Sequence, residues 1–119
     1  MRYVSTRGNA PPVRFDELLF AGLAPDGGLY VPEAWPSIGI DEVRALAGLP
    51  YLQVVNRIVT PYLKDSIEPR ILEGIIENAY AGFEHTAVAP LRQLSSHEWM
   101  LELFHGPTLA FKDFALQLL

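Results

Sequence analysis

The chain contains two lysines, and one of them is placed where its amine could act as a nucleophile. Lys112 follows a Gly-Pro loop at residues 105–108 and begins a predicted helix over residues 111–119. Its apolar neighbours, Phe111 and Phe114, disfavour the charged ammonium form, and a helix start adds positive potential. Both effects favour the neutral amine, which is the form that attacks an aldehyde.

The residues alone leave a second interpretation of this lysine open. A lysine beside an acid such as Asp113 at a helix start is often a surface residue whose stem covers apolar groups. The other lysine, Lys64, lies in a polar connection at residues 63–66 and is expected to be solvated.

The spacing of the histidines and glycines gives little support for a metal site or a phosphate-binding loop. His85, His97 and His105 do not share a helix face, and the chain has no cysteine, so we predict no metal site. The pair Gly27–Gly28 follows an aspartate in a turn rather than a strand, so it is not a phosphate-binding loop.

The bulk composition favours one folded, mildly acidic domain. The chain has 119 residues, of which 50% are hydrophobic and 19% charged, with a net charge of −5. No basic patch exists to offset phosphate charge, so neither nucleic acid nor membrane is expected as a partner. The start of the chain has no apolar run typical of a secretory signal, and the apolar run at residues 18–24 is too short to cross a bilayer. We therefore expect a soluble, cytoplasmic protein.

The hydrophobic pattern predicts a helix-rich α+β fold. Two amphipathic helices are indicated by apolar residues at helical spacing, and we expect Pro61 to end or kink the first of them. Pro69 is suited to the first position of the second. Asp41 is expected to cap a shorter helix. The predicted strands cover residues 2–6 and 98–104, and the predicted helices cover residues 15–23, 42–47, 50–60, 68–82 and 111–119.

The last residues form an apolar run that nothing in the sequence closes. Residues 114–119 contain no glycine, no basic last turn and no polar end. Exposed leucines would form an uncovered apolar patch, so our hypothesis is that the chain is a fragment whose last helix packs against residues beyond it.

Four segments in order resemble one enzyme family. Residues 101–115 (LELFHGPTLAFKDFA) look like the cofactor-lysine motif of threonine synthases. Residues 3–8 (YVSTRG) and 15–33 (FDELLFAGLAPDGGLYVPE) are similar to the amino-terminal stretch of that family, and residues 79–83 match it too. The resemblance therefore runs over nearly the whole chain.

The resemblance implies a fold-type II enzyme that uses pyridoxal 5'-phosphate. Residues 1–95 would be the helix-rich amino-terminal domain, and residues 96–119 would supply the first strand and helix of the catalytic domain. Lys112 would bind the cofactor covalently and move protons during the conversion of O-phospho-L-homoserine and water to L-threonine and phosphate. His105 and Thr108, in the loop ahead of the lysine, would contact the substrate or close the loop by hydrogen bonds to its own backbone.

The chain departs from the wider fold-type II pattern at two positions, and two alternative functions are considered. The wider fold-type II group often has serine two residues before the lysine and arginine two after it, where this chain has Ala110 and Phe114. One rival is another fold-type II lyase or dehydratase, and the second is a non-catalytic helical interaction module. The cofactor-phosphate site is expected further along the chain, so the protein's partner includes the remainder of its own chain. We expect the 119 residues alone to bind the cofactor poorly and to make no threonine.

Overall fold

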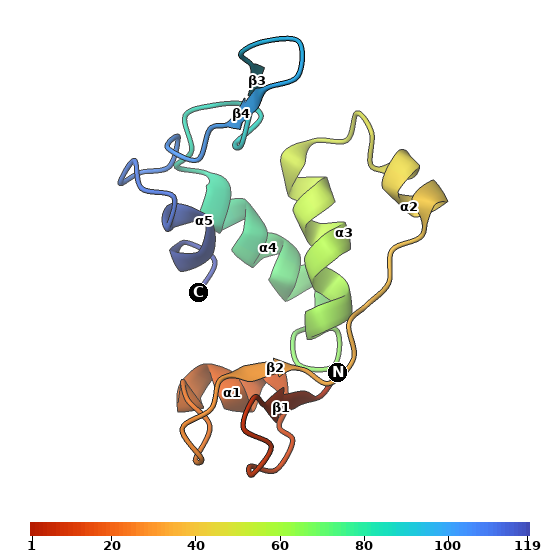
Figure 1. Ribbon diagram of the computed structural model, residues 1–119, viewed down its shortest axis with the longest axis vertical. Coiled ribbons are helices and arrows are strands. Elements are labelled where there is room, and N and C mark those ends of the chain that lie inside the picture. Colours follow the sequence, from red (N-terminus) through yellow and green to blue (C-terminus); the bar gives the residue numbers. More distant parts are fainter. The chain divides into compact units, whose positions relative to one another are not determined.

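The computed structural model describes all residues from 1 to 119. It divides into two compact units, one formed by residues 1–47 and 57–72, the other by residues 48–56 and 73–119. Two helices contribute to both units: α3 (Tyr51–Leu63) and α4 (Pro69–Tyr80). The elements follow one another along the chain as β1, α1, β2, α2, α3, α4, β3, β4 and α5 (Figure 1).

The first unit is built on a short antiparallel strand pair. β1 (Tyr3–Ser5) pairs with β2 (Tyr30–Pro32), and Val13 forms an isolated bridge to Tyr3. Helix α1 (Phe15–Ala21) lies alongside this pair (Figure 1). Tyr3 is buried, and its hydroxyl donates a hydrogen bond of 3.0 Å to the carbonyl of Tyr62. The predicted strand at residues 2–6 is therefore confirmed. The hydrogen bond from Tyr3 connects this strand to the end of α3.

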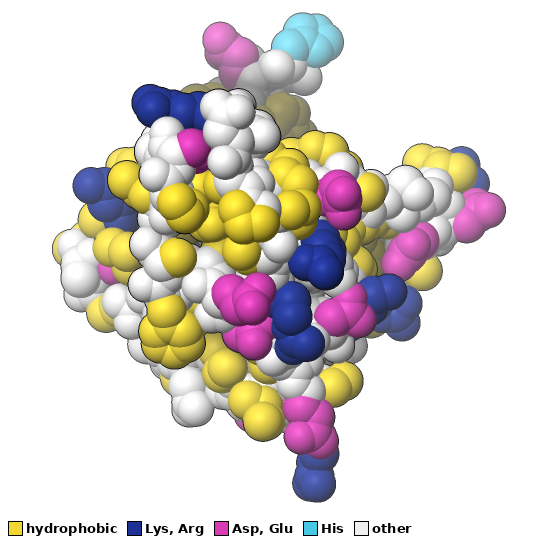
Figure 2. All heavy atoms as spheres, turned by 90° about the horizontal axis from the view of Figure 1, so that it is seen from below, with side chains coloured by type: hydrophobic (Ala, Val, Ile, Leu, Met, Phe, Trp, Pro, Cys, Tyr) yellow, Lys and Arg dark blue, Asp and Glu magenta, His cyan; other side chains and the backbone are white.

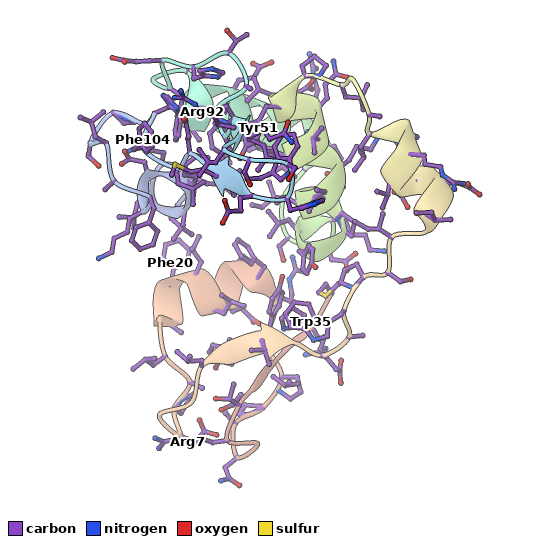
Figure 3. All side chains as sticks on the ribbon, turned by 45° about the horizontal axis from the view of Figure 1, so that its top comes forward. Arg7, Phe20, Trp35, Tyr51, Arg92 and Phe104 are labelled. Atoms are coloured by element: carbon purple, nitrogen blue, oxygen red, sulfur yellow. The ribbon has the colours of Figure 1, made fainter.

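A tight turn between α1 and β2 is held by one carboxylate. Asp26 accepts hydrogen bonds from the hydroxyl of Ser5 (2.7 Å) and from the backbone N–H groups of Gly28 and Asn9 (both 2.9 Å). The hydrogen bond from Ser5 is the main reason why the pKa of Asp26 lies below its ordinary value of 3.8. The carbonyl of Asp26 also accepts a hydrogen bond from Arg7, labelled in Figure 3. This network joins the loop after β1 to the turn before β2.

Replacing Gly28 by alanine is expected to destabilise the 119-residue chain by about 2 kcal/mol. A Cβ at this position would overlap the hydroxyl oxygen of buried Ser5 and approach Asp26 Oδ1 to 3.0 Å. Urea denaturation followed by circular dichroism measures the change. The matched control is Gly74→Ala on α4, where a Cβ meets nothing within 4 Å and the change should stabilise by about 0.5–1 kcal/mol. Equal effects of the two substitutions would contradict the expectation.

Helix α1 begins and ends close to where the sequence predicts. The carboxylate of Glu17 accepts a 2.7 Å hydrogen bond from the backbone N–H of Arg14 at the helix start. Gly22 ends the helix in a left-handed conformation, with φ of 69° and its N–H bonded to the Leu18 carbonyl. The helix is two residues shorter than predicted. Phe20 projects from it with 91% of its surface exposed (Figure 3).

The prediction that Asp41 caps the second helix is wrong. Helix α2 (Ile40–Ala45) begins two residues earlier than predicted, and Gly39 occupies the N-cap. Asp41 lies inside the first turn, where its carboxylate forms an exposed ion pair with Arg44 at 3.0 Å. The Gly39 carbonyl accepts the first helical hydrogen bond, and no side chain is needed for this.

The third helix does not end at Pro61, which was one of the two outcomes expected for this proline. α3 continues through Pro61 to Leu63. Proline removes one backbone hydrogen bond, but the residues after it are held by tertiary contacts. Leu63 is buried, and the Tyr62 carbonyl is the acceptor for the Tyr3 hydroxyl. These contacts outweigh the local cost of the proline.

Helix α4 carries the most buried residues of the chain. Leu72 and Ile76 have the largest fully buried side chains, and Pro69 occupies the first helical position as predicted. The predicted apolar stripe is confirmed in most of its length. Ile71 is the exception, because 56% of its surface is exposed.

The second unit contains a strand hairpin followed by the shortest helix. β3 (Leu91–Gln93) pairs antiparallel with β4 (Trp99–Leu101), so the strand predicted over residues 98–104 is shorter than expected. Residues 103 and 104 have no partner strand within the chain, which ends the ladder. Helix α5 (Asp113–Leu116) is likewise shorter than the predicted 111–119.

None of the helices combines the length and the apolar character needed to span a bilayer. On the face shown in Figure 2, acidic and basic side chains lie next to one another among hydrophobic ones.

Candidate functional site

Lys112 lies at the N-cap of α5, directly after the loop at residues 106–110. Its side chain is exposed, and its ε-amine makes no hydrogen bond or ion pair. Phe111 next to it is 66% exposed, so the apolar shielding predicted from the sequence is not present in this chain. The site therefore offers an unpaired amine, reached by water, at the start of a helix.

The acid that follows the lysine is buried and does not form an ion pair with it. Asp113 is only 2% exposed, and its two carboxylate oxygens accept hydrogen bonds from Thr108. The Thr108 hydroxyl donates to Oδ1 at 2.7 Å, and the Thr108 backbone N–H donates to Oδ2 at 2.9 Å. Burial raises the pKa of Asp113, but the hydrogen bonds from Thr108 outweigh it, so the net pKa lies below 3.8. The carboxylate is charged at neutral pH, and it is hydrogen-bonded to Thr108 in the loop and to the side chain of Gln117.

The same loop has two features that require close packing against Asp113. Gly106 is buried, and a Cβ there would lie 2.5 Å from Asp113 Oδ2 and 2.6 Å from its Cβ. Leu109 has a φ of 61°, a conformation that residues other than glycine seldom adopt. The backbone is therefore bent sharply around one carboxylate.

Two aromatic contacts attach α5 to the end of α4. The Tyr80 hydroxyl donates a 3.0 Å hydrogen bond to the carbonyl of Phe114. The Phe83 ring lies between them, with ring centroids 5.2 Å from Tyr80 and 5.0 Å from Phe114. Figure 1 shows α5 beside α4. Lys112 is thus held between a fixed loop and an anchored helix.

The two other predicted site residues both contact carboxylates. Thr108 bonds to Asp113 as described, and His105 Nε2 lies 2.7 Å from the carboxylate of Glu102. The His85 ring lies 5.0 Å from the His105 ring, measured between centroids. Lys112, Thr108 and His105 therefore lie in one stretch of the second unit, each with a different neighbour.

Sequence reasoning missed Asp113 and Glu102 as partners. Each carboxylate was detectable in principle, because Glu102 precedes His105 by three residues and Asp113 follows Thr108 by five. Neither spacing by itself distinguishes a hydrogen-bonded acid from a solvated one. No group of three or more histidine, aspartate or glutamate side chains is placed to hold a metal ion.

Comparison with known proteins identifies the family. The family model described as threonine synthase N terminus matches residues 2–80, which is more than half of the chain. The chain belongs to the threonine synthase N-terminal family. The whole chain is 56% identical to a threonine synthase from Pseudomonas aeruginosa over 119 residues. It is 42% identical over 117 residues to a rat protein named threonine synthase-like 2.

Solved structures of this family have the same fold. A PLP-bound threonine synthase from Brucella melitensis superposes with a TM-score of 0.96 at 49% identity, over 99% of the chain. The yeast threonine synthase gives a TM-score of 0.90 at 35% identity, over 98% of the chain. The predicted α+β class is therefore confirmed. The chain spans about a quarter of the length of these proteins: 25% of the Pseudomonas and Brucella chains and 24% of the yeast chain.

Proposed function

We propose that the whole protein is a pyridoxal phosphate-dependent threonine synthase that converts O-phospho-L-homoserine and water to L-threonine and phosphate. Lys112 is its cofactor lysine in this proposal. The observation that carries the proposal is the unpaired ε-amine of Lys112 at the start of α5, within a chain that is 56% identical to a threonine synthase.

The residues present fit an amine that must condense with an aldehyde. A lysine paired with a carboxylate is held in the ammonium form, which is not nucleophilic. Here the adjacent carboxylate of Asp113 is buried and bonded to Thr108, so it does not compete for the amine. When bound, the cofactor would supply an electron sink for the substrate carbanion. Lys112 would then carry protons to and from the α and β carbons of the substrate as general base and acid.

His105 and Thr108 remain our proposed substrate contacts. Each side chain has an atom that is free to form a hydrogen bond with a substrate. The Thr108 hydroxyl donates its hydrogen to Asp113, but its oxygen can still accept a hydrogen bond. The His105 Nε2 faces Glu102, whereas its Nδ1 has no hydrogen-bond partner. Both atoms lie in the segment that leads to Lys112.

We also propose that residues 1–95 form the amino-terminal domain and that residues 96–119 begin the catalytic domain. The family match ends at residue 80, before this boundary. The boundary falls in the turn between β3 and β4. In this proposal the remaining three-quarters of the protein supplies the cofactor-phosphate site.

An assay of the whole protein tests the reaction. We expect phosphate and threonine to appear in equal amounts from O-phospho-L-homoserine. Turnover of serine or threonine to a keto acid should be at least about 100-fold slower, because a site built for the substrate phosphate is left with unpaired polar groups. The 119-residue chain alone serves as the control and should produce no threonine. Faster release of ammonia from serine or threonine would assign the protein to the dehydratases instead.

A further inference from the structure

We propose that Asp113 is a positioning residue, whose buried carboxylate fixes the loop at residues 106–110 and so decides where the Lys112 amine emerges. This inference rests on the proposed role of Lys112. Asp113 is not assigned a catalytic role, because its carboxylate is buried and accepts two hydrogen bonds from Thr108.

The conformation of the loop at residues 106–110 needs an outside constraint. Leu109 sits at a φ of 61°, where its side chain crowds its own backbone. A conformation of this kind persists only where the surrounding structure holds it. Glycine would adopt it freely, but the sequence has leucine here.

Asp113 supplies this constraint from the far end of the loop. Its carboxylate accepts two hydrogen bonds from Thr108, and its own backbone N–H donates one of 3.0 Å to the Ala110 carbonyl. One residue therefore ties the chain on both sides of Leu109. Gly106 allows this, since any larger residue would collide with the Asp113 side chain.

The same constraint acts on the backbone of Lys112. The Lys112 backbone carbonyl accepts hydrogen bonds from the N–H groups of Ala115 (3.1 Å) and Leu116 (2.9 Å), which commits it to α5. Only Phe111 and Lys112 lie between Ala110 and Asp113, the two residues that this backbone hydrogen bond joins. A relaxed loop would move the Cα of Lys112, and a displacement of about 1 Å at a reacting group can cost about 100-fold in rate.

The experiment compares the whole protein with its Asp113→Asn variant. Apoprotein is mixed with pyridoxal phosphate, samples are reduced with borohydride at intervals, and the modified peptide containing Lys112 is quantified by mass spectrometry. Asparagine keeps the size of the side chain but replaces one acceptor oxygen with an NH₂ group, which cannot receive the Thr108 donors. We expect modification at Lys112 to slow by about 100-fold, with a matching fall in kcat and little change in KM.

A second measurement separates positioning from general damage to the cofactor site. In a Lys112→Ala background, adding Asp113→Asn should leave non-covalent cofactor binding unchanged within about threefold, because the carboxylate acts only through the lysine. Loss of non-covalent binding in the double variant would overturn the proposal.

A second pair of variants keeps the proposal testable if Asp113→Asn does not fold. Thr108→Val removes one of the two hydrogen bonds and should slow modification of Lys112 by about tenfold, and Thr108→Ser should restore it. The matched control is Asp41→Asn, which removes an exposed carboxylate far along the sequence and should change nothing. An unchanged modification rate in Thr108→Val would overturn the proposal. Absence of any label on Lys112 in the unaltered protein would instead overturn the proposed function.

Discussion

Replacing Lys112 by alanine in the whole protein is expected to abolish covalent cofactor binding and to lower turnover by about 1,000-fold or more. The substitution removes both the nucleophile that captures the aldehyde and the group that moves protons at the substrate carbons. General acid–base catalysis alone contributes about 100- to 10,000-fold. No other residue of this chain offers an unpaired amine on the same loop, because Lys64 is the only other lysine.

Borohydride reduction followed by peptide mapping measures the covalent bond, and phosphate release measures turnover. Lys64→Ala is the matched control, since that side chain is also exposed but lies in the connection after α3. It should leave labelling and turnover within about twofold of the unaltered protein, as surface substitutions normally do. Full turnover by the Lys112→Ala variant would refute the assignment of this lysine.

Replacing Ile76 by alanine is expected to destabilise the 119-residue chain by about 3 kcal/mol. Only 1% of the Ile76 surface is exposed, so truncation removes buried apolar area and leaves a cavity. The same substitution at Ile71 is the control, because the residue type and the helix are the same but 56% of that side chain is exposed. Its expected cost is below about 1 kcal/mol.

Urea denaturation with the transition followed by circular dichroism compares the two variants. The slope of the transition should stay the same, while its midpoint falls for Ile76→Ala. A smaller midpoint shift for Ile76→Ala than for Ile71→Ala would show that the buried face of α4 is assigned incorrectly.

Local sequence signals were sufficient where one residue decides the conformation. Pro69 suits the first position of α4 because its missing N–H would have no partner there. The apolar spacing of α4 likewise predicted its buried face, since that face follows from the helical repeat alone. Each of these outcomes depends on neighbours within one turn.

Predictions failed at two helix boundaries, where other contacts compete with the local preference. Pro61 was expected to end or kink α3, but the helix continues through it to the buried Leu63. Asp41 was expected to cap α2, but the helix begins earlier and the carboxylate pairs with Arg44 instead. In both cases the difference in free energy between the predicted and the observed helix boundary is too small for the local sequence to determine which one forms.

The candidate site shows the same division. The sequence by itself determined the family, the α+β class and the order of the loop, Lys112 and α5, because these depend on residue types in a fixed order. The tertiary structure alone decided which way the Asp113 carboxylate points. In sequence it neighbours the lysine and could have paired with it. Burial against Gly106 and two hydrogen bonds from Thr108 turn it inward, and this leaves the amine free.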